Sequence, residues 1–125
     1  MRNALNWFEI PVQDMNRAQA FYEGMTERPM RREAFGPPGE VMAVFAYDAG
    51  EAVGGALLLS AHARPSDQGT LVYLNADPRI DDWLARVASA GGQVVLPKTS
   101  LPGGMGYIAH IRDTEGNRVG IHAVA

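Results

Sequence analysis

The sequence has no cysteine among its 125 residues. This absence excludes disulfide bonds, thiolate metal ligands and a cysteine nucleophile. It suits a reducing compartment, and we predict a cytoplasmic location. No apolar run approaches the roughly 20 residues that a membrane-spanning helix needs, and the first residues show no secretion-signal pattern. We therefore expect neither a membrane association nor an export signal.

Basic charge is also scarce. Eleven lysines and arginines stand against 14 aspartates and glutamates, which gives a net charge of −3 and no basic run. This balance argues against nucleic-acid binding. The hydrophobic content of 46% and the charged content of 20% are ordinary for a globular protein. A chain of this length forms one domain, or two half-size modules that share a core.

Residues 6–25 predict a strand that runs directly into a helix. Apolar side chains at positions 8, 10 and 12 alternate with those at 7, 9 and 11, which is the period of a strand. Asp14 occupies an N-cap position, where its carboxylate accepts a hydrogen bond from a free helix N–H. Helical spacing follows in Met15, Ala18, Phe21, Tyr22 and Met25. We expect the even-numbered strand side chains to pack under the helix, and Trp7, Glu9 and Pro11 to face away.

The same order of elements occurs twice along the chain. Strands are predicted at residues 30–35, 41–47 and 52–60, with turns at 36–39 and 48–51, and a polar linker follows at 61–68. The second half continues with a strand at 71–76, a helix that begins at Asp77-Pro78 and ends at Gly91-Gly92, a strand at 93–97, a loop at 100–105, and a hairpin of 107–112 with 118–123. Module one therefore spans residues 1–60, and module two spans residues 69–125.

This duplication predicts the fold class. A shift of 64 residues places Trp7 on Leu71 and Glu9 on Tyr73. A four-stranded sheet with one helix leaves its other face bare, and two such sheets paired edge to edge enclose a hollow. We predict one α+β domain over residues 1–125, in which two βαβββ modules form a curved eight-stranded mixed sheet around a cavity.

Several motifs carry a resemblance to a known family. They are Phe8-Glu9-Ile10-Pro11-Val12-Gln13-Asp14, Arg17-Ala18, Phe21-Tyr22, Gly69-Thr70-Leu71-Val72-Tyr73-Leu74-Asn75, Gly91-Gly92 and Asp113-Thr114-Glu115-Gly116-Asn117. The chain resembles the vicinal oxygen chelate superfamily over nearly its whole length. That superfamily includes glyoxalases, bleomycin-resistance proteins and extradiol dioxygenases, and the chain is most similar to its glyoxalase-like branch. Thr114 replaces a usual proline. The resemblance implies this fold and a homodimer, but it leaves the reaction open.

The resemblance also implies where a metal would be held. Enzymes of the superfamily bind a divalent metal through His, Glu or Gln on the first and last strands of each module. In this sequence the first-strand positions fall on Trp7 and Leu71, and the last-strand positions fall on Gly54 or Gly55 and on Gly120. None of these side chains can ligate a metal. We therefore predict no metal and no other cofactor at this site.

Other polar residues are predicted to line the cavity. In the hairpin, His110 pairs with Gly120, so His110, Arg112, Arg118, Gly120 and His122 share a face. Because the resemblance makes Gly120 a former ligand position, this is the predicted cavity face. We name Glu9, His110 and His122 as catalytic candidates. The candidates for ligand binding are Trp7, Leu71, Tyr73, Asn75, Arg112 and Arg118.

The chemistry of this set leaves alternatives open. A Glu beside a Trp in an apolar cavity should have a raised pKa, and His titrates near neutrality, so acid–base work is one role. The structural alternative is an ion pair of Glu9 with Arg112 or Arg118, together with half-buried structural histidines. A metal held by Glu9, His110 and His122 is a further alternative.

These observations predict a protein that binds a small organic molecule in a metal-free cavity. The first alternative is a metal-independent lyase or isomerase that uses Glu9 with His110 or His122. The second is a drug-binding protein of the bleomycin-resistance kind, which sequesters its ligand in a cleft lined by aromatic residues such as Trp7 and Tyr73. A small accessory module without a ligand is the third.

Overall fold

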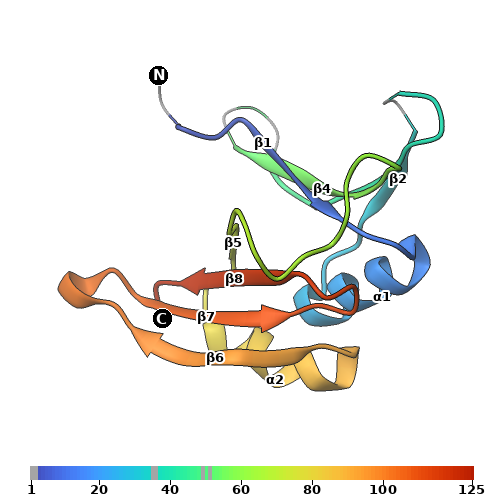
Figure 1. Ribbon diagram of the computed structural model, residues 1–125. Helices are drawn as coiled ribbons and strands as arrows, with labels where there is room; N and C mark the ends of the chain where they lie inside the picture. Colours follow the sequence, from blue (N-terminus) through green and yellow to red (C-terminus); the bar gives the residue numbers. More distant parts are fainter. Residues whose placement is uncertain (1–2, 35–36, 49, 51) are drawn as a thin grey trace.

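The computed structural model describes residues 3–34, 37–48, 50 and 52–125. Phe35, Gly36, Ala49 and Glu51, which belong to predicted strands and turns, lie outside the described residues. The first module contains β1 (Trp7–Pro11), α1 (Met15–Thr26), β2 (Arg31–Glu33), β3 (Val41–Val44) and β4 (Gly54–Leu59). Its strands are ordered β1-β4-β3-β2, and β1 runs parallel to β4 (Figure 1).

The second module repeats this topology. It contains β5 (Tyr73–Asn75), α2 (Ile80–Ala90), β6 (Gln93–Ser100), the 3₁₀ turn η1 (Pro102–Gly104), β7 (Tyr107–Arg112) and β8 (Arg118–Ala123). Its strands are ordered β5-β8-β7-β6, and β5 runs parallel to β8. The α+β class and the two βαβββ modules are confirmed. The eight strands are divided between two four-stranded sheets, in which β1 and β5 each form an edge.

The strand–helix unit at the start of the chain folds as its sequence predicts. Ile10 and Val12 are buried and Phe8 packs against the same core, whereas Trp7 packs on the opposite face with Met42, Val44, Ala56 and Leu58. The Asp14 carboxylate accepts a hydrogen bond from the Arg17 N–H at 3.0 Å, which confirms the predicted N-cap. The alternation of β1 therefore separates a core face from a bare face.

The second helix begins later than predicted. Arg79 holds its N-cap position and contributes no side-chain hydrogen bond. The Asp77 carboxylate accepts instead from the Val124 N–H at 2.9 Å, so it fixes the C-terminal segment rather than the helix. The prediction that this helix begins at Asp77-Pro78, with Asp77 as its N-cap, is wrong, because a partner 47 residues away takes the Asp77 carboxylate.

One core joins the two modules through their helices. Phe21, Tyr22 and Met25 of α1 lie in the same buried cluster as Ile80 and Val87 of α2. The helices pack against each other where Gly24 faces Ala90, and a Cβ at Gly24 would lie 3.1 Å from the Ala90 Cβ.

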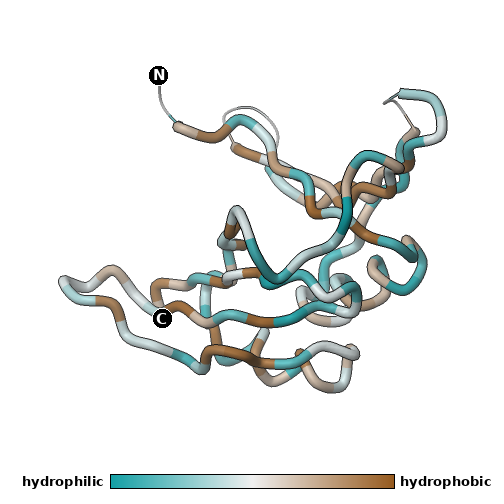
Figure 2. Tube along the Cα trace, viewed as in Figure 1, coloured by the Kyte–Doolittle hydropathy of each residue, from teal (hydrophilic) through white to brown (hydrophobic). Residues whose placement is uncertain are grey.

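The segment between β4 and β5 is mostly hydrophilic (Figure 2). No helix in the described part of the chain has the length and hydropathy to span a membrane.

Candidate functional site

The bare face of the second sheet brings three predicted site residues together. Tyr73 pairs with Gly120, and Gly120 pairs with His110, as the predicted hairpin register requires. The Tyr73 hydroxyl lies 2.7 Å from His110 Nε2, and Arg118 Nε donates to His110 Nδ1 at 3.0 Å. The three side chains thus form a connected row across β5, β7 and β8.

The Tyr73 ring takes this place because position 120 has no side chain. A Cβ at Gly120 would lie 2.5 Å from Tyr73 Cδ1, a separation that real Cβ atoms do not show. Tyr73 nevertheless keeps 44% of its surface exposed. Its ring is therefore held against the sheet while its other side remains open to a ligand.

His110 sits in an environment that favours its neutral form. Partial burial of the ring and the positive charge of Arg118 lower the pKa of His110 below its usual value of 6.5. At neutral pH the imidazole is therefore uncharged, and each of its nitrogens is engaged by a named partner.

The other predicted residues make separate contacts. His122 Nε2 lies 2.7 Å from the Met105 carbonyl oxygen, so this nitrogen carries a proton and donates. Arg112 forms an ion pair with Asp67 at 3.3 Å. Glu9 is exposed, and its carboxylate accepts a hydrogen bond from the Trp7 indole at 3.3 Å. Within the described residues neither arginine pairs with Glu9, so the predicted ion pair is wrong.

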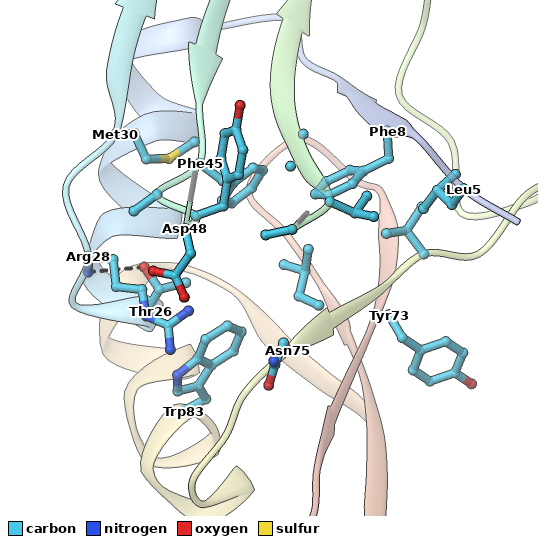
Figure 3. A pocket seen from close by; sticks show the side chains of 18 of the residues that line it. Leu5, Phe8, Thr26, Arg28, Met30, Phe45, Asp48, Tyr73, Asn75 and Trp83 are labelled. Carbon is cyan, nitrogen blue, oxygen red and sulfur yellow. Dashed lines mark hydrogen bonds between the residues drawn. The ribbon is translucent and has the colours of Figure 1, made fainter. Parts of the chain in front are cut away.

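The larger of two described cavities lies between the modules and has a volume of about 830 Å³. Phe8, Met30 and Phe45 of module one form one wall, and Trp83 with residues 70–75 forms the other (Figure 3). The rings of Phe8 and Phe45 are 5.6 Å apart. Arg28 lies 5.6 Å over the Trp83 ring, and together with Asp48 it forms a polar end of the cavity (Figure 3).

The sequence predicted the Leu71, Tyr73 and Asn75 side of this cavity but not its wall from module one. The prediction placed the hollow against Trp7 and Glu9, but Phe8 and Gly55, on the helix-bearing side of β1 and β4, line it instead. The sequence feature that could have indicated this wall is the Gly54-Gly55 pair. Gly55 leaves room for the Phe8 ring, which a Cβ at that position would overlap. Phe8 and Trp83 were expected only as core residues. Phe45 was not singled out.

A second cavity of about 490 Å³ opens on the bare side of the second module. It is lined by Tyr73, Leu74, Asn75, Asp77, Leu101, Ile108 and His122. The three residues of β5 line both cavities, and Leu71 lines the larger one. The ligand-binding candidates Leu71, Tyr73 and Asn75 are therefore cavity residues, whereas Trp7, Glu9, Arg112 and Arg118 line neither cavity.

The residues at the family's metal positions do not fit a metal. A shift of 64 residues carries the register pair Glu9–Ala56 onto Tyr73–Gly120, so Ala56 corresponds to Gly120 and replaces the predicted Gly54 or Gly55. Like Gly120, Ala56 has no donor atom. In the described ranges, no three His, Asp or Glu side chains are grouped as a metal site, so Glu9, His110 and His122 do not form one.

Two βαβββ modules, each with one helix on a four-stranded sheet, define the fold of this chain. Residues 4–121 match the model of the Glyoxalase/Bleomycin resistance protein/Dioxygenase superfamily, and the chain belongs to this family. No curated protein matches the sequence.

Solved structures share the fold at low sequence identity. The E144Q mutant of glyoxalase I from Zea mays is 19% identical with a TM-score of 0.70, covering 96% of this chain and 46% of that chain. TnmS3, an antibiotic binding protein from Streptomyces sp. CB03234, is 20% identical with a TM-score of 0.64, covering 97% and 95%. A family enzyme from Burkholderia phytofirmans PsJN is 17% identical with a TM-score of 0.68, covering 96% and 98%. The chain spans about half the length of the maize enzyme.

Proposed function

We propose that this protein binds a small organic molecule with an aromatic or other flat apolar part along β5. The observation that carries this proposal is that β5 lines both cavities, so one short strand can contact a ligand from either side. The larger volume falls within the range of small-molecule sites, and its wall of Phe8, Phe45 and Trp83 suits an apolar ring. Tyr73 and Asn75 add the few polar groups that orient a ligand.

Binding without chemistry is the first form of this function. The fold is shared with an antibiotic binding protein, TnmS3, and aromatic walls suit sequestration of a drug-like molecule. A metal-independent lyase or isomerase is the second form. It needs Glu9 to meet His110 or His122, yet Glu9 is on the first sheet and both histidines are on the second. We therefore propose the binding role first.

We further propose a cytoplasmic homodimer that binds no nucleic acid. The net charge of −3 opposes nucleic-acid binding, and the absence of cysteine suits a reducing compartment. β1 and β5 each lie at an edge of their sheet, where backbone groups that no neighbouring strand covers can pair with a second copy. A partner's sheet beside these edges would extend the walls of both cavities.

A cavity-filling variant tests the proposed binding site. Leu71→Trp adds bulk at the wall of the larger cavity, and we expect it to weaken binding of aromatic compounds because the indole occupies part of the space and changes the shape of the wall. The measurement is calorimetric titration with a panel of aromatic amines, aromatic carboxylic acids and neutral aromatic compounds. Val94→Trp is the matched control, since Val94 is 39% exposed on β6 and lines neither cavity. Equal binding by both variants would refute the site.

A further inference from the structure

The row formed by Arg118, His110 and Tyr73 has a fixed direction of hydrogen bonding. Arg118 Nε can only donate, so His110 Nδ1 accepts and carries no proton. The proton of the neutral imidazole is therefore on Nε2, which donates to the Tyr73 oxygen at 2.7 Å. The Tyr73 hydroxyl proton is left to point away from His110.

The hydroxyl proton of Tyr73 is not used within the row, and Tyr73 is a cavity residue. Tyr73 lines both cavities, and 44% of its surface is exposed. Each donor in the row is polarised by the one before it, which strengthens the last donor. The row therefore ends on an O–H donor of a solvent-exposed residue that lines both cavities.

The positive charge of Arg118 lies at the other end of the row from Tyr73. Within the described residues no carboxylate lies within ion-pair distance of Arg118, whereas Arg112 on the same face is paired with Asp67. Arg118 is half-buried, so its charge is incompletely screened by water. A negatively charged ligand at Tyr73 would balance it.

We propose that Tyr73 is a ligand-binding donor that selects an anionic oxygen, such as a carboxylate, on an aromatic ligand. The proposal rests on the proposed small-molecule function and adds the chemical class. Gly120 is the positioning residue, because a side chain there would displace the Tyr73 ring. Gly120, where the resemblance implies a metal ligand, thus leaves room for the ring of a hydrogen-bond donor that can bind the ligand's oxygen.

The first test reads the protonation of His110 directly. We expect long-range ¹H–¹⁵N spectra at pH 7 to show His110 with a bare Nδ1 and a protonated Nε2, because Arg118 donates to Nδ1. His62, which is exposed, serves as the reference for an unconstrained ring in the same spectrum. A proton on His110 Nδ1 would overturn the proposal, since Tyr73 would then have to donate to His110 and not to a ligand.

The second test compares three probes of similar shape and different charge: benzoate, benzyl alcohol and benzylamine. We expect benzoate to bind most tightly, and Tyr73→Phe to weaken it about tenfold, which is the loss of one hydrogen bond to a charged group. Tyr107→Phe is the matched control, because Tyr107 lies on the same sheet but outside the row and lines neither cavity. Unchanged benzoate binding in Tyr73→Phe, or a preference for benzylamine, would overturn the proposal.

The outcomes separate this inference from the broader function. A protein that binds neutral or cationic aromatic compounds but not benzoate overturns the anion selectivity and leaves the binding function intact. A protein that binds no compound of the panel removes both. Gly120→Ala gives an independent check, because the displaced Tyr73 ring should lower benzoate affinity to the level of Tyr73→Phe while Tyr73 itself is retained.

Discussion

Glu115 is the residue that ties the β7–β8 turn to the start of α1. Its carboxylate accepts hydrogen bonds from the Gln13 and Asp14 N–H groups, each at 2.9 Å, and pairs with Arg17 at 2.7 Å. Burial alone would raise the pKa of Glu115, but the bonds from Arg17 and from the two backbone groups lower it to about 2. The ionised carboxylate therefore links the second module to the first.

This pKa predicts how stability depends on pH. Since the folded-state pKa lies below the usual 4.5, Glu115 stabilises the fold above pH 4.5, and this contribution is lost as the pH falls toward 2. We expect Glu115→Gln to lower the free energy of unfolding on the order of 2 kcal/mol at pH 7, and to match the wild type near pH 2. Urea unfolding across this pH range measures the difference. Glu9→Gln, at an exposed site, should show none.

A pH-independent gap between Glu115→Gln and the wild type would contradict this account, because the loss would then come from packing rather than charge. The buried pair of Tyr22 and Asp113 also contains ionisable groups. Tyr22 donates to Asp113 at 2.6 Å, and burial together with Asp113 raises the pKa of Tyr22 well above 10. Tyr22 therefore stays neutral throughout the acid range, and because Asp113 is present in both proteins, the comparison of Glu115→Gln with the wild type isolates Glu115.

At the scale of elements, the two helices depend on a close approach at Gly24. A larger side chain there would press on Ala90, because even a Cβ would lie 3.1 Å from the Ala90 Cβ. We expect Gly24→Val to destabilise the fold by about 1–3 kcal/mol, the usual cost of overpacking. Chemical denaturation measures this loss. The double variant Gly24→Val/Ala90→Gly should recover part of it, and no recovery would show that the strain arises elsewhere.

Local patterns predicted the elements whose partners are near in sequence. The alternation of β1 and the Asp14 cap depend on neighbouring residues, and both are confirmed. The hairpin register that joins His110 to Gly120 is confirmed for the same reason. Asp77 was misassigned because Val124 takes its carboxylate, and no local pattern reveals a partner so distant. The Phe8 wall of the larger cavity was missed, because the alternation of β1 was taken to direct Phe8 under the helix and Trp7 toward the hollow.

The site was predicted in part. The face shared by Tyr73, His110 and Arg118 followed from counting alternate residues, and the structure places these three in contact. The direction of their hydrogen bonds did not follow, because it depends on which nitrogen of His110 meets Arg118. The catalytic roles named for Glu9, His110 and His122 stay predictions.

At the scale of the whole molecule, the free edges of β1 and β5 predict association. We expect sedimentation equilibrium to give about twice the chain mass of 13.5 kDa, because a homodimer covers both edges at once. A mass of a single chain across micromolar concentrations would contradict the homodimer. The cavities would then be complete within one chain.

The central claim is that a small molecule is bound along β5. The most direct measurement is a ¹H–¹⁵N correlation spectrum of the protein, titrated with whichever compound of the aromatic panel binds most tightly. We predict that the largest changes fall on residues 71–75 and on the indole of Trp83, which share the larger cavity. Changes confined to the Trp7 face or to β6, with residues 71–75 unaffected, would contradict the account.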